Sequence, residues 1–193
     1  MVGVLALQGN FASHIQILND IGIDSTLVKN LEDLSNLQGL ILPGGESTTM
    51  SNLLLRDQSF IDGIKSFSDN KPIFGTCAGL ILMSKNSFDK KVLNMNILDI
   101  EVDRNAYGRQ VHSFDDSINF ECKSVKSQSI KASFIRAPKI TSIGKDVEII
   151  CKHNNEIVGV KEGMHMAVTC HPELQNETLL HSCVLKDNYE IFK

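Results

Sequence analysis

The chain lacks an excess of positive charge, a long apolar run and a paired-cysteine spacing. Its 19 lysines and arginines stand against 23 aspartates and glutamates, a net charge of −4. No basic run is sustained, which argues against nucleic-acid binding. The five cysteines show no CxxC spacing, and this odd number argues against a disulfide framework or structural zinc and for a reducing compartment. No apolar stretch approaches the roughly 18 residues of a membrane helix.

The chain also lacks internal repeats, an evident linker and a basic leader in Met1–Gln8. We therefore expect residues 1–193 to form one domain, large enough to bury a proper core. The absence of a leader and of a membrane segment predicts a soluble, cytoplasmic protein.

What the chain does contain is a cysteine set between glycines, in the segment Phe74-Gly75-Thr76-Cys77-Ala78-Gly79. Apolar runs precede and follow it, so the segment indicates a nucleophile elbow, a sharp strand-to-helix turn that lifts the Cys77 thiol clear of the sheet. The helix starting at Ala78 would point its positive end at the sulfur and favour the thiolate. Most cysteines are simply small buried residues, but this context predicts that Cys77 is a nucleophile.

Much later the chain reads Thr169-Cys170-His171-Pro172-Glu173. Pro172 favours an extended backbone before it, so the side chains of His171 and Glu173 can face the same way. His171 could then take the thiol proton while Glu173 orients the imidazole ring. Cys170 adjoins His171, but neighbours on a strand point to opposite faces, so it is not expected to be the nucleophile.

The first half of the chain alternates apolar strand-length runs with helical periodicity, which predicts an α/β fold: a three-layer, mostly parallel, doubly wound sheet. The active site of such a sheet lies at the carboxyl ends of its strands. Strands are expected at Val2–Leu7, Ser25–Lys29, Gly39–Leu42 and Pro72–Phe74, and helical rhythm at Phe11–Ile21 and Met50–Phe67.

The second half reads mainly as strands, which we expect to add to the sheet in antiparallel fashion. Asn154-Asn155 is predicted to form a tight turn, and a helix is expected at about Thr178–Tyr189. The expected strands are Asn96–Asp103, Ser129–Arg136, Asp146–His153 and Glu156–Lys161.

A glycine turn, Pro43-Gly44-Gly45-Glu46-Ser47, offers backbone amides that a ligand can approach. The turn, the elbow and His171-Pro172-Glu173, in this order, resemble the class I (triad) glutamine amidotransferases, whose fold is flavodoxin-like. Further blocks narrow the resemblance to the family of glutaminase subunits of pyridoxal 5′-phosphate synthase. The blocks are Leu7–Gly9, Leu42–Met50, Gly75–Leu80, Arg104–Gln110, Phe134–Pro138 and His171–Glu173, while Ser84–Asn96 and Asp115–Ser129 match nothing in the family pattern.

The resemblance implies that Cys77, His171 and Glu173 hydrolyse L-glutamine through a thioester, with an oxyanion hole near Gly45 and Ala78. It implies no cofactor, and it implies a partner: the synthase protein, a (β/α)₈ barrel in a ring-shaped core that receives the ammonia. Gln8 is expected to couple the site to that partner. By similarity, glutamine would be bound by Gly45, Glu46, Ser47, Arg104, Ile135 and Arg136.

Other interpretations remain open at this point. They are a glutaminase subunit of another pathway, an elbow-type cysteine hydrolase or chaperone, and a degenerate regulatory subunit. The remaining cysteines, Cys122, Cys151, Cys170 and Cys183, are expected to be core or surface residues. No metal is predicted, because the other histidines have no carboxylate or cysteine at the spacing of metal ligands. These histidines are His14, His112, which follows the Arg104 block, His153, His165 and His181.

Overall fold

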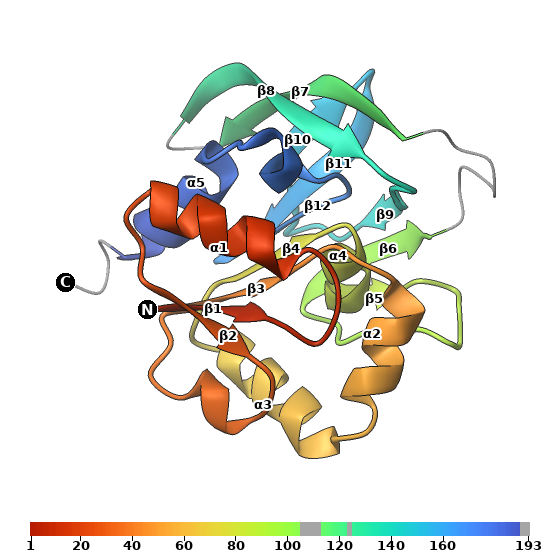
Figure 1. Cartoon of the computed structure of the whole chain (residues 1–193). Coiled ribbons are helices and arrows are strands. Elements are labelled where there is room, and N and C mark those ends of the chain that lie inside the picture. Colours follow the sequence, from red (N-terminus) through yellow and green to blue (C-terminus); the bar gives the residue numbers. More distant parts are fainter. Residues whose placement is uncertain (105–112, 123–124, 190–193) are drawn as a thin grey trace.

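The computed structural model describes residues 1–104, 113–122 and 125–189 (Figure 1). Asn105–Gln110 of the Arg104 block, His112 and the side chain of Cys122 therefore lie outside the described part. The strands are β1 (Val2–Leu5), β2 (Ser25–Val28), β3 (Gly39–Leu42), β4 (Ile73–Thr76), β5 (Ser84–Asn86), β6 (Leu98–Asp103), β7 (Phe114–Cys122), β8 (Val125–Phe134), β9 (Lys139–Ile143), β10 (Glu148–His153), β11 (Glu156–Glu162) and β12 (His165–Val168). The helices are α1 (Phe11–Asp20), α2 (Ser47–Leu54), α3 (Gln58–Ser68), α4 (Ala78–Met83) and α5 (Leu179–Tyr189), with 3₁₀ turns η1 (Glu32–Leu34) and η2 (Pro172–Gln175).

The main sheet has nine strands in the order β2-β1-β3-β4-β12-β11-β10-β7-β8. The first five are parallel, and β11, β10, β7 and β8 continue the sheet in antiparallel fashion. The predicted α/β class, with a parallel sheet and antiparallel additions, is confirmed. In the register of β12 and β4, Val168 lies beside Thr76, so the chain segments that follow these two strands leave the sheet next to one another.

Helices cover both faces of the parallel part of the sheet (Figure 1). α1 and α5 pack on one face, where Leu18 and Val184 join Val4 in one apolar cluster. α2, α3 and α4 pack on the other face, where Met50 and Ile64 join Leu40 in a second cluster. Because both faces are buried, β1 and β3 are apolar throughout rather than alternating, as the sequence indicated, and β4 is apolar up to Thr76.

The helical rhythm expected over Met50–Phe67 is confirmed, and it is divided between two helices. α2 ends at Leu54, and the Asp57 side chain accepts a hydrogen bond (3.1 Å) from the Phe60 N–H to start α3. One expectation about the second half was wrong. The strand expected at Asn96–Asp103 is β6, and it joins β5 and β9 in a separate three-stranded sheet rather than extending the main one.

The segment Asp115–Ser129, which matched no pattern, lies in the β7–β8 hairpin at the edge of the main sheet. Its first strand begins with a run of exposed residues, and of the described side chains in this strand Ile118 and Phe120 are the buried ones. An alternation this short gives a weak strand signal. None of the helices among the described residues is long and apolar enough to cross a membrane.

Candidate active site

Cys77 lies at the sharp turn between β4 and α4. Its backbone has φ 46° and ψ −101°, a conformation that non-glycine residues rarely adopt, and its N–H donates to the Val168 carbonyl at 2.9 Å. Gly79 lets α4 lie against β3, because a Cβ there would overlap the Leu42 carbonyl. The turn expected from the glycines around Cys77 is therefore present, with the cysteine held in a strained backbone.

His171 and Glu173 follow β12 and meet directly. His171 Nδ1 lies 2.8 Å from Glu173 Oε1, and both side chains are buried. The expected contact is present, but its local cause differs from the expectation: Pro172 opens the 3₁₀ turn η2, and this turn brings Glu173 back under the imidazole. The Cys77 side chain lies close enough to raise the pKa of His171, so the three residues form one array, here called the Cys77–His171–Glu173 array.

His171 and Glu173 of the array are charged although both side chains are buried. Burial alone would lower the pKa of His171, but hydrogen bonds and charges from Cys77 and Glu173 outweigh it and raise the pKa to about 10. Burial would raise the pKa of Glu173, yet interactions with His14 and His171 hold it below its usual value. A protonated His171 beside an ionised Glu173 is thus the favoured state of this pair at neutral pH.

The glycine turn packs against the array. A Cβ on Gly44 would overlap the His171 ring, so only glycine fits there. The Gly44 carbonyl accepts from the Asn10 N–H at 2.9 Å, and the Glu46 N–H donates to Gln8 Oε1 at 2.9 Å. Gln8 and Gly45 are thus neighbours beside His171, at the carboxyl ends of β1 and β3, and Ala78 lies at the start of α4 next to Cys77.

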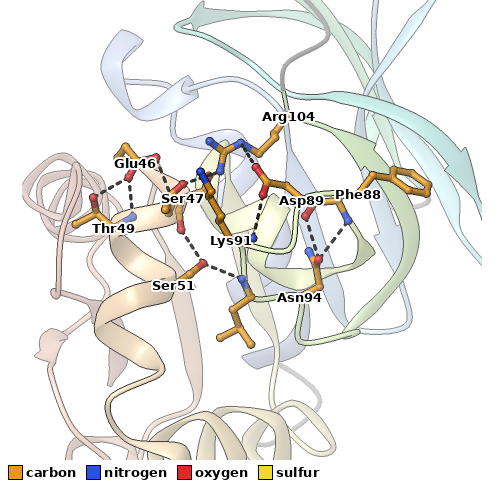
Figure 2. A network of polar contacts seen from close by, with 12 residues as sticks. Glu46, Ser47, Thr49, Ser51, Phe88, Asp89, Lys91, Asn94 and Arg104 are labelled. Atoms are coloured by element: carbon orange, nitrogen blue, oxygen red, sulfur yellow. Dashed lines mark hydrogen bonds and ion pairs between the residues drawn. The ribbon is translucent and has the colours of Figure 1, made fainter.

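Three of the residues expected to bind glutamine, Glu46, Ser47 and Arg104, lie around the start of α2 (Figure 2). Arg104 donates from one terminal nitrogen to Ser47 Oγ (3.2 Å) and Thr48 Oγ1 (2.7 Å), and its Nε lies 3.5 Å from Asp89 Oδ2. The Glu46 carboxylate caps the same helix, accepting from the Thr48 and Thr49 N–H groups. Slight burial would raise the pKa of Glu46, but these hydrogen bonds outweigh it and lower the pKa.

Ile135 and Arg136 reach the array from the end of β8. Ser133 and His171 exchange backbone hydrogen bonds, which set the end of β8 beside the array. The Ile135 carbonyl then lies 3.9 Å from the Cys77 sulfur, and Arg136 follows with a positive φ of 47° and an exposed side chain. The structure thus gathers the residues of the expected site at the carboxyl ends of the parallel strands, and Asn105–Gln110 lie outside the described residues.

Three polar residues beside the array were not expected from the sequence. Asn10 Nδ2 lies 3.4 Å from Glu173 Oε1, His14 Nε2 lies 3.6 Å from the same oxygen, and His181 contacts His14. The available signal was the helical spacing of Phe11, Ile15 and Leu18, whose face includes His14. Among the described residues, no three His, Cys, Asp or Glu side chains are grouped so that they could hold a metal ion.

Comparison with known proteins agrees with this geometry. Residues 4–188 match the SNO glutamine amidotransferase family. Over 185 residues the chain is 44% identical to "Pyridoxal 5'-phosphate synthase subunit PdxT" of Oenococcus oeni, covering 96% of this chain and 95% of that protein. It is 45% identical over 185 residues to the protein of the same name from Streptococcus pneumoniae, covering 93% of each.

Solved structures give the same picture of the fold. A structure described as a glutamine amidotransferase superposes with a TM-score of 0.87 at 36% identity, covering 97% of this chain and 98% of that one. A chain in the structure of PurLQS from Thermotoga maritima superposes with a TM-score of 0.68 at 17% identity, covering 98% of this chain and 94% of that one. The second likeness concerns the fold alone.

Proposed function

The chain belongs to the SNO glutamine amidotransferase family, and from this we propose that it is the glutaminase subunit of a pyridoxal 5′-phosphate synthase. It hydrolyses L-glutamine to L-glutamate and ammonia, and the ammonia passes to the synthase subunit for pyridoxal 5′-phosphate formation. The observation that carries this proposal is the Cys77–His171–Glu173 array at the strand ends. The name shared by the relatives at 44% and 45% identity supports the pathway.

In the proposed mechanism, the Cys77 thiolate attacks the side-chain carbonyl carbon of glutamine. His171 holds the thiol proton as imidazolium and gives it to the departing ammonia, leaving a glutamyl thioester. A water molecule then loses a proton to His171 and attacks the thioester, which releases glutamate and restores the thiol. Glu173 keeps the second imidazole proton on Nδ1 and offsets the imidazolium charge.

Each tetrahedral intermediate carries a negative oxygen, which we assign to the backbone amides of Gly45 and Ala78. Loss of one such donor typically costs about 3 to 4 kcal/mol of barrier. The position of Ala78 directly after the nucleophile supports its part, because the amide following an elbow nucleophile is a usual oxyanion donor.

We assign the amino-acid end of glutamine to Gly45, Glu46, Ser47, Arg104, Ile135 and Arg136. An arginine suits the α-carboxylate because its planar fork pairs with both oxygens. Arg104 already donates to the hydroxyls of Ser47 and Thr48, so its guanidinium is oriented before substrate arrives. Glu46 would face the α-ammonium while it caps α2, so one carboxylate would serve both donors.

The proposal requires a partner, the synthase subunit, which the family builds as a ring-shaped core of (β/α)₈ barrels. Gln8 couples the site to it in our proposal, because its side-chain oxygen holds the Glu46 N–H beside Gly45. Movement of that contact on docking would complete the oxyanion hole. We also propose that residues 1–193 act as one glutaminase domain in the cytoplasm; the free thiols of Cys77 and Cys170 fit a reducing compartment.

The test is glutamate release from glutamine by wild type and Cys77→Ala, each with and without the synthase subunit. We expect release that rises on adding synthase and vanishes in Cys77→Ala. Wild-type release that synthase does not change would mean a glutaminase of another pathway, and no release in any mixture would favour a cysteine hydrolase or a regulatory subunit. In the same assay, full synthase stimulation of Gln8→Ala would refute the role of Gln8.

A further inference from the structure

Two buried histidines that the proposed mechanism does not use lie directly behind Glu173. They are His14 on α1 and His181 on α5, and neither is exposed to solvent. His14 Nδ1 lies 2.8 Å from His181 Nε2. The other ring nitrogen, His14 Nε2, lies 3.2 Å from Thr76 Oγ1 and 3.6 Å from Glu173 Oε1. His14 therefore touches both the residue that precedes Cys77 and the carboxylate at the far end of the array.

Few other contacts stabilise the negative charge of the Glu173 carboxylate. Its side chain is buried, and among the described residues nothing hydrogen-bonds Oε2. Oε1 contacts His171, more distantly Asn10 Nδ2, and His14. In the described part of the chain, the titratable side chains that contact this oxygen are His171 and His14. A buried carboxylate is costly unless its neighbours compensate it, so each of these contacts matters.

We assign the ring protons from the neighbours of each nitrogen. A bare nitrogen at His14 Nε2 would turn its lone pair toward the Glu173 carboxylate 3.6 Å away, so we place the proton on Nε2, where it can also reach Thr76 Oγ1 at 3.2 Å. Nδ1 of His14 then accepts, and His181 Nε2 donates to it at 2.8 Å. In this assignment His181 Nδ1 carries no proton, and this atom has no hydrogen-bond partner among the described residues. The T-shaped packing of the His181 ring on Phe74, with centroids 5.0 Å apart, fixes the orientation of that ring.

Building on the proposed function, we propose that His14, oriented by His181, is a positioning residue that keeps Glu173 ionised and aligned with His171. It acts through Glu173 and does not touch the substrate carbonyl. Without the His14 N–H, Glu173 takes up a proton more readily, and the His171 imidazolium loses its counter-charge. The Cys77 thiolate then loses the positively charged imidazolium beside it. The acid limit of activity therefore moves to higher pH and the basic limit to lower pH.

The charged surroundings of Glu173 support this direction. α1 supplies His14, the turn after β4 supplies Cys77, α5 supplies His181 through His14, and His171 lies on the same segment as Glu173. On β8, the Ser133 hydroxyl donates a hydrogen bond to the carboxylate of Asp115 on β7. Burial lowers the pKa of His14 more than the Glu173 charge raises it, so His14 acts as a neutral donor. Burial also lowers the pKa of His181, well below its usual value.

Two substitutions of His14 distinguish a role in positioning Glu173 from a role in packing alone. In His14→Gln the side-chain amide reaches the place of Nε2 and can still donate toward Glu173, whereas in His14→Asn it reaches only the place of Nδ1. In the complex with the synthase subunit, we expect His14→Asn to lower kcat by about 10- to 100-fold, the usual effect of losing a hydrogen bond to a charged group. Its KM for glutamine should stay unchanged. We expect His14→Gln to keep most of the wild-type kcat.

The pH profile gives a second readout. In His14→Asn the range of pH over which glutamate is released should shrink by roughly one unit at each limb, a tenfold change in each equilibrium. Site-resolved alkylation of Cys77 by iodoacetamide should begin at a correspondingly higher pH. The matched control is His165→Gln, which removes another histidine from the fold at the start of β12, where it accepts from the Ile73 N–H. This control should leave both profiles unchanged.

The inference is overturned if His14→Asn keeps the wild-type kcat and pH profile, or if Asn and Gln reduce kcat equally, as a packing role alone would require. Wild-type protein that releases no glutamate with synthase would instead refute the proposed function. In that event the alkylation profile of Cys77 still decides the inference, because it does not depend on turnover.

Discussion

At the scale of single residues, the candidate site depends on how closely Gly44 approaches His171. A methyl group at Gly44 would overlap the imidazole ring, so Gly44→Ala must push His171 away from Cys77 or Glu173. Because misplacement by about 1 Å can cost 100-fold in rate, we expect kcat for glutamate release to fall by about that factor. The measurement is steady-state kinetics of the complex with synthase.

The control for Gly44→Ala is Gly22→Ala. Gly22 also has a positive φ, of 72°, but no atom lies near its Cβ position. It should therefore show the cost of backbone strain without a change in kcat. Wild-type kcat in Gly44→Ala would mean that the His171 position is not critical.

Arg104 and Arg136 offer a second prediction at this scale. If their guanidinium groups bind the α-carboxylate, Arg104→Ala and Arg136→Ala should raise the KM for glutamine by about 10- to 100-fold, the usual effect of losing a charged hydrogen bond. Arg56, an exposed arginine between α2 and α3, is the matched control and should not change KM when replaced by alanine. An unchanged KM in both Arg104→Ala and Arg136→Ala would remove the assignment.

At the scale of elements, Ser51 joins α2 to the loop that follows β5 (Figure 2). Its buried hydroxyl donates to the Ser47 carbonyl at 2.7 Å and accepts from the Leu93 N–H at 2.9 Å. Ser51→Ala would leave the Leu93 N–H unsatisfied, which costs about 1 to 3 kcal/mol. We expect a lower free energy of unfolding by urea titration and faster hydrogen exchange of the Leu93 amide.

Exposed Ser66 on α3 is the matched control for this change. Ser66→Ala should alter the free energy of unfolding by no more than about 0.5 kcal/mol. Equal stability of the two variants would show that the loop is held by other contacts, such as those of Asn94 with Ile81 and Ser84.

At the scale of the whole molecule, buried histidines give the protein a stability that depends on pH in both directions. Burial lowers the folded-state pKa of His14, His165 and His181 below the usual 6.5. The unfolded chain therefore binds protons first, and the free energy of unfolding should fall as pH drops below about 6.5. His171 acts oppositely: its pKa of about 10 gives stability that is complete below 6.5 and is lost as pH rises through about 10.

Urea unfolding at pH 5, 7 and 10 should therefore show greatest stability at the middle value. In His165→Gln the loss between pH 7 and pH 5 should be smaller, because one fewer proton is taken up on unfolding. A wild-type stability that rises between pH 7 and pH 5 would contradict the neutral, buried state of these histidines.

The sequence by itself determined the parallel α/β fold and the segments that carry the site. Glycines around Cys77 make room for a sharp turn, and runs such as Gly39–Leu42 are apolar throughout because both faces of the sheet are covered. These are local constraints, written in neighbouring residues. The β7 strand escaped notice for the same reason, because its exposed beginning carries little alternation of apolar and polar residues.

Only the tertiary structure decided which distant residues support the array. His14, Thr76 and His181 stand far apart in the chain, and no local pattern marks any of them as a neighbour of Glu173. They meet because α1 and α5 pack on the same face of the sheet, above the end of β4. Periodicity tells which face of a helix is buried, but the partner it meets there is set by packing between segments separated by more than 100 residues.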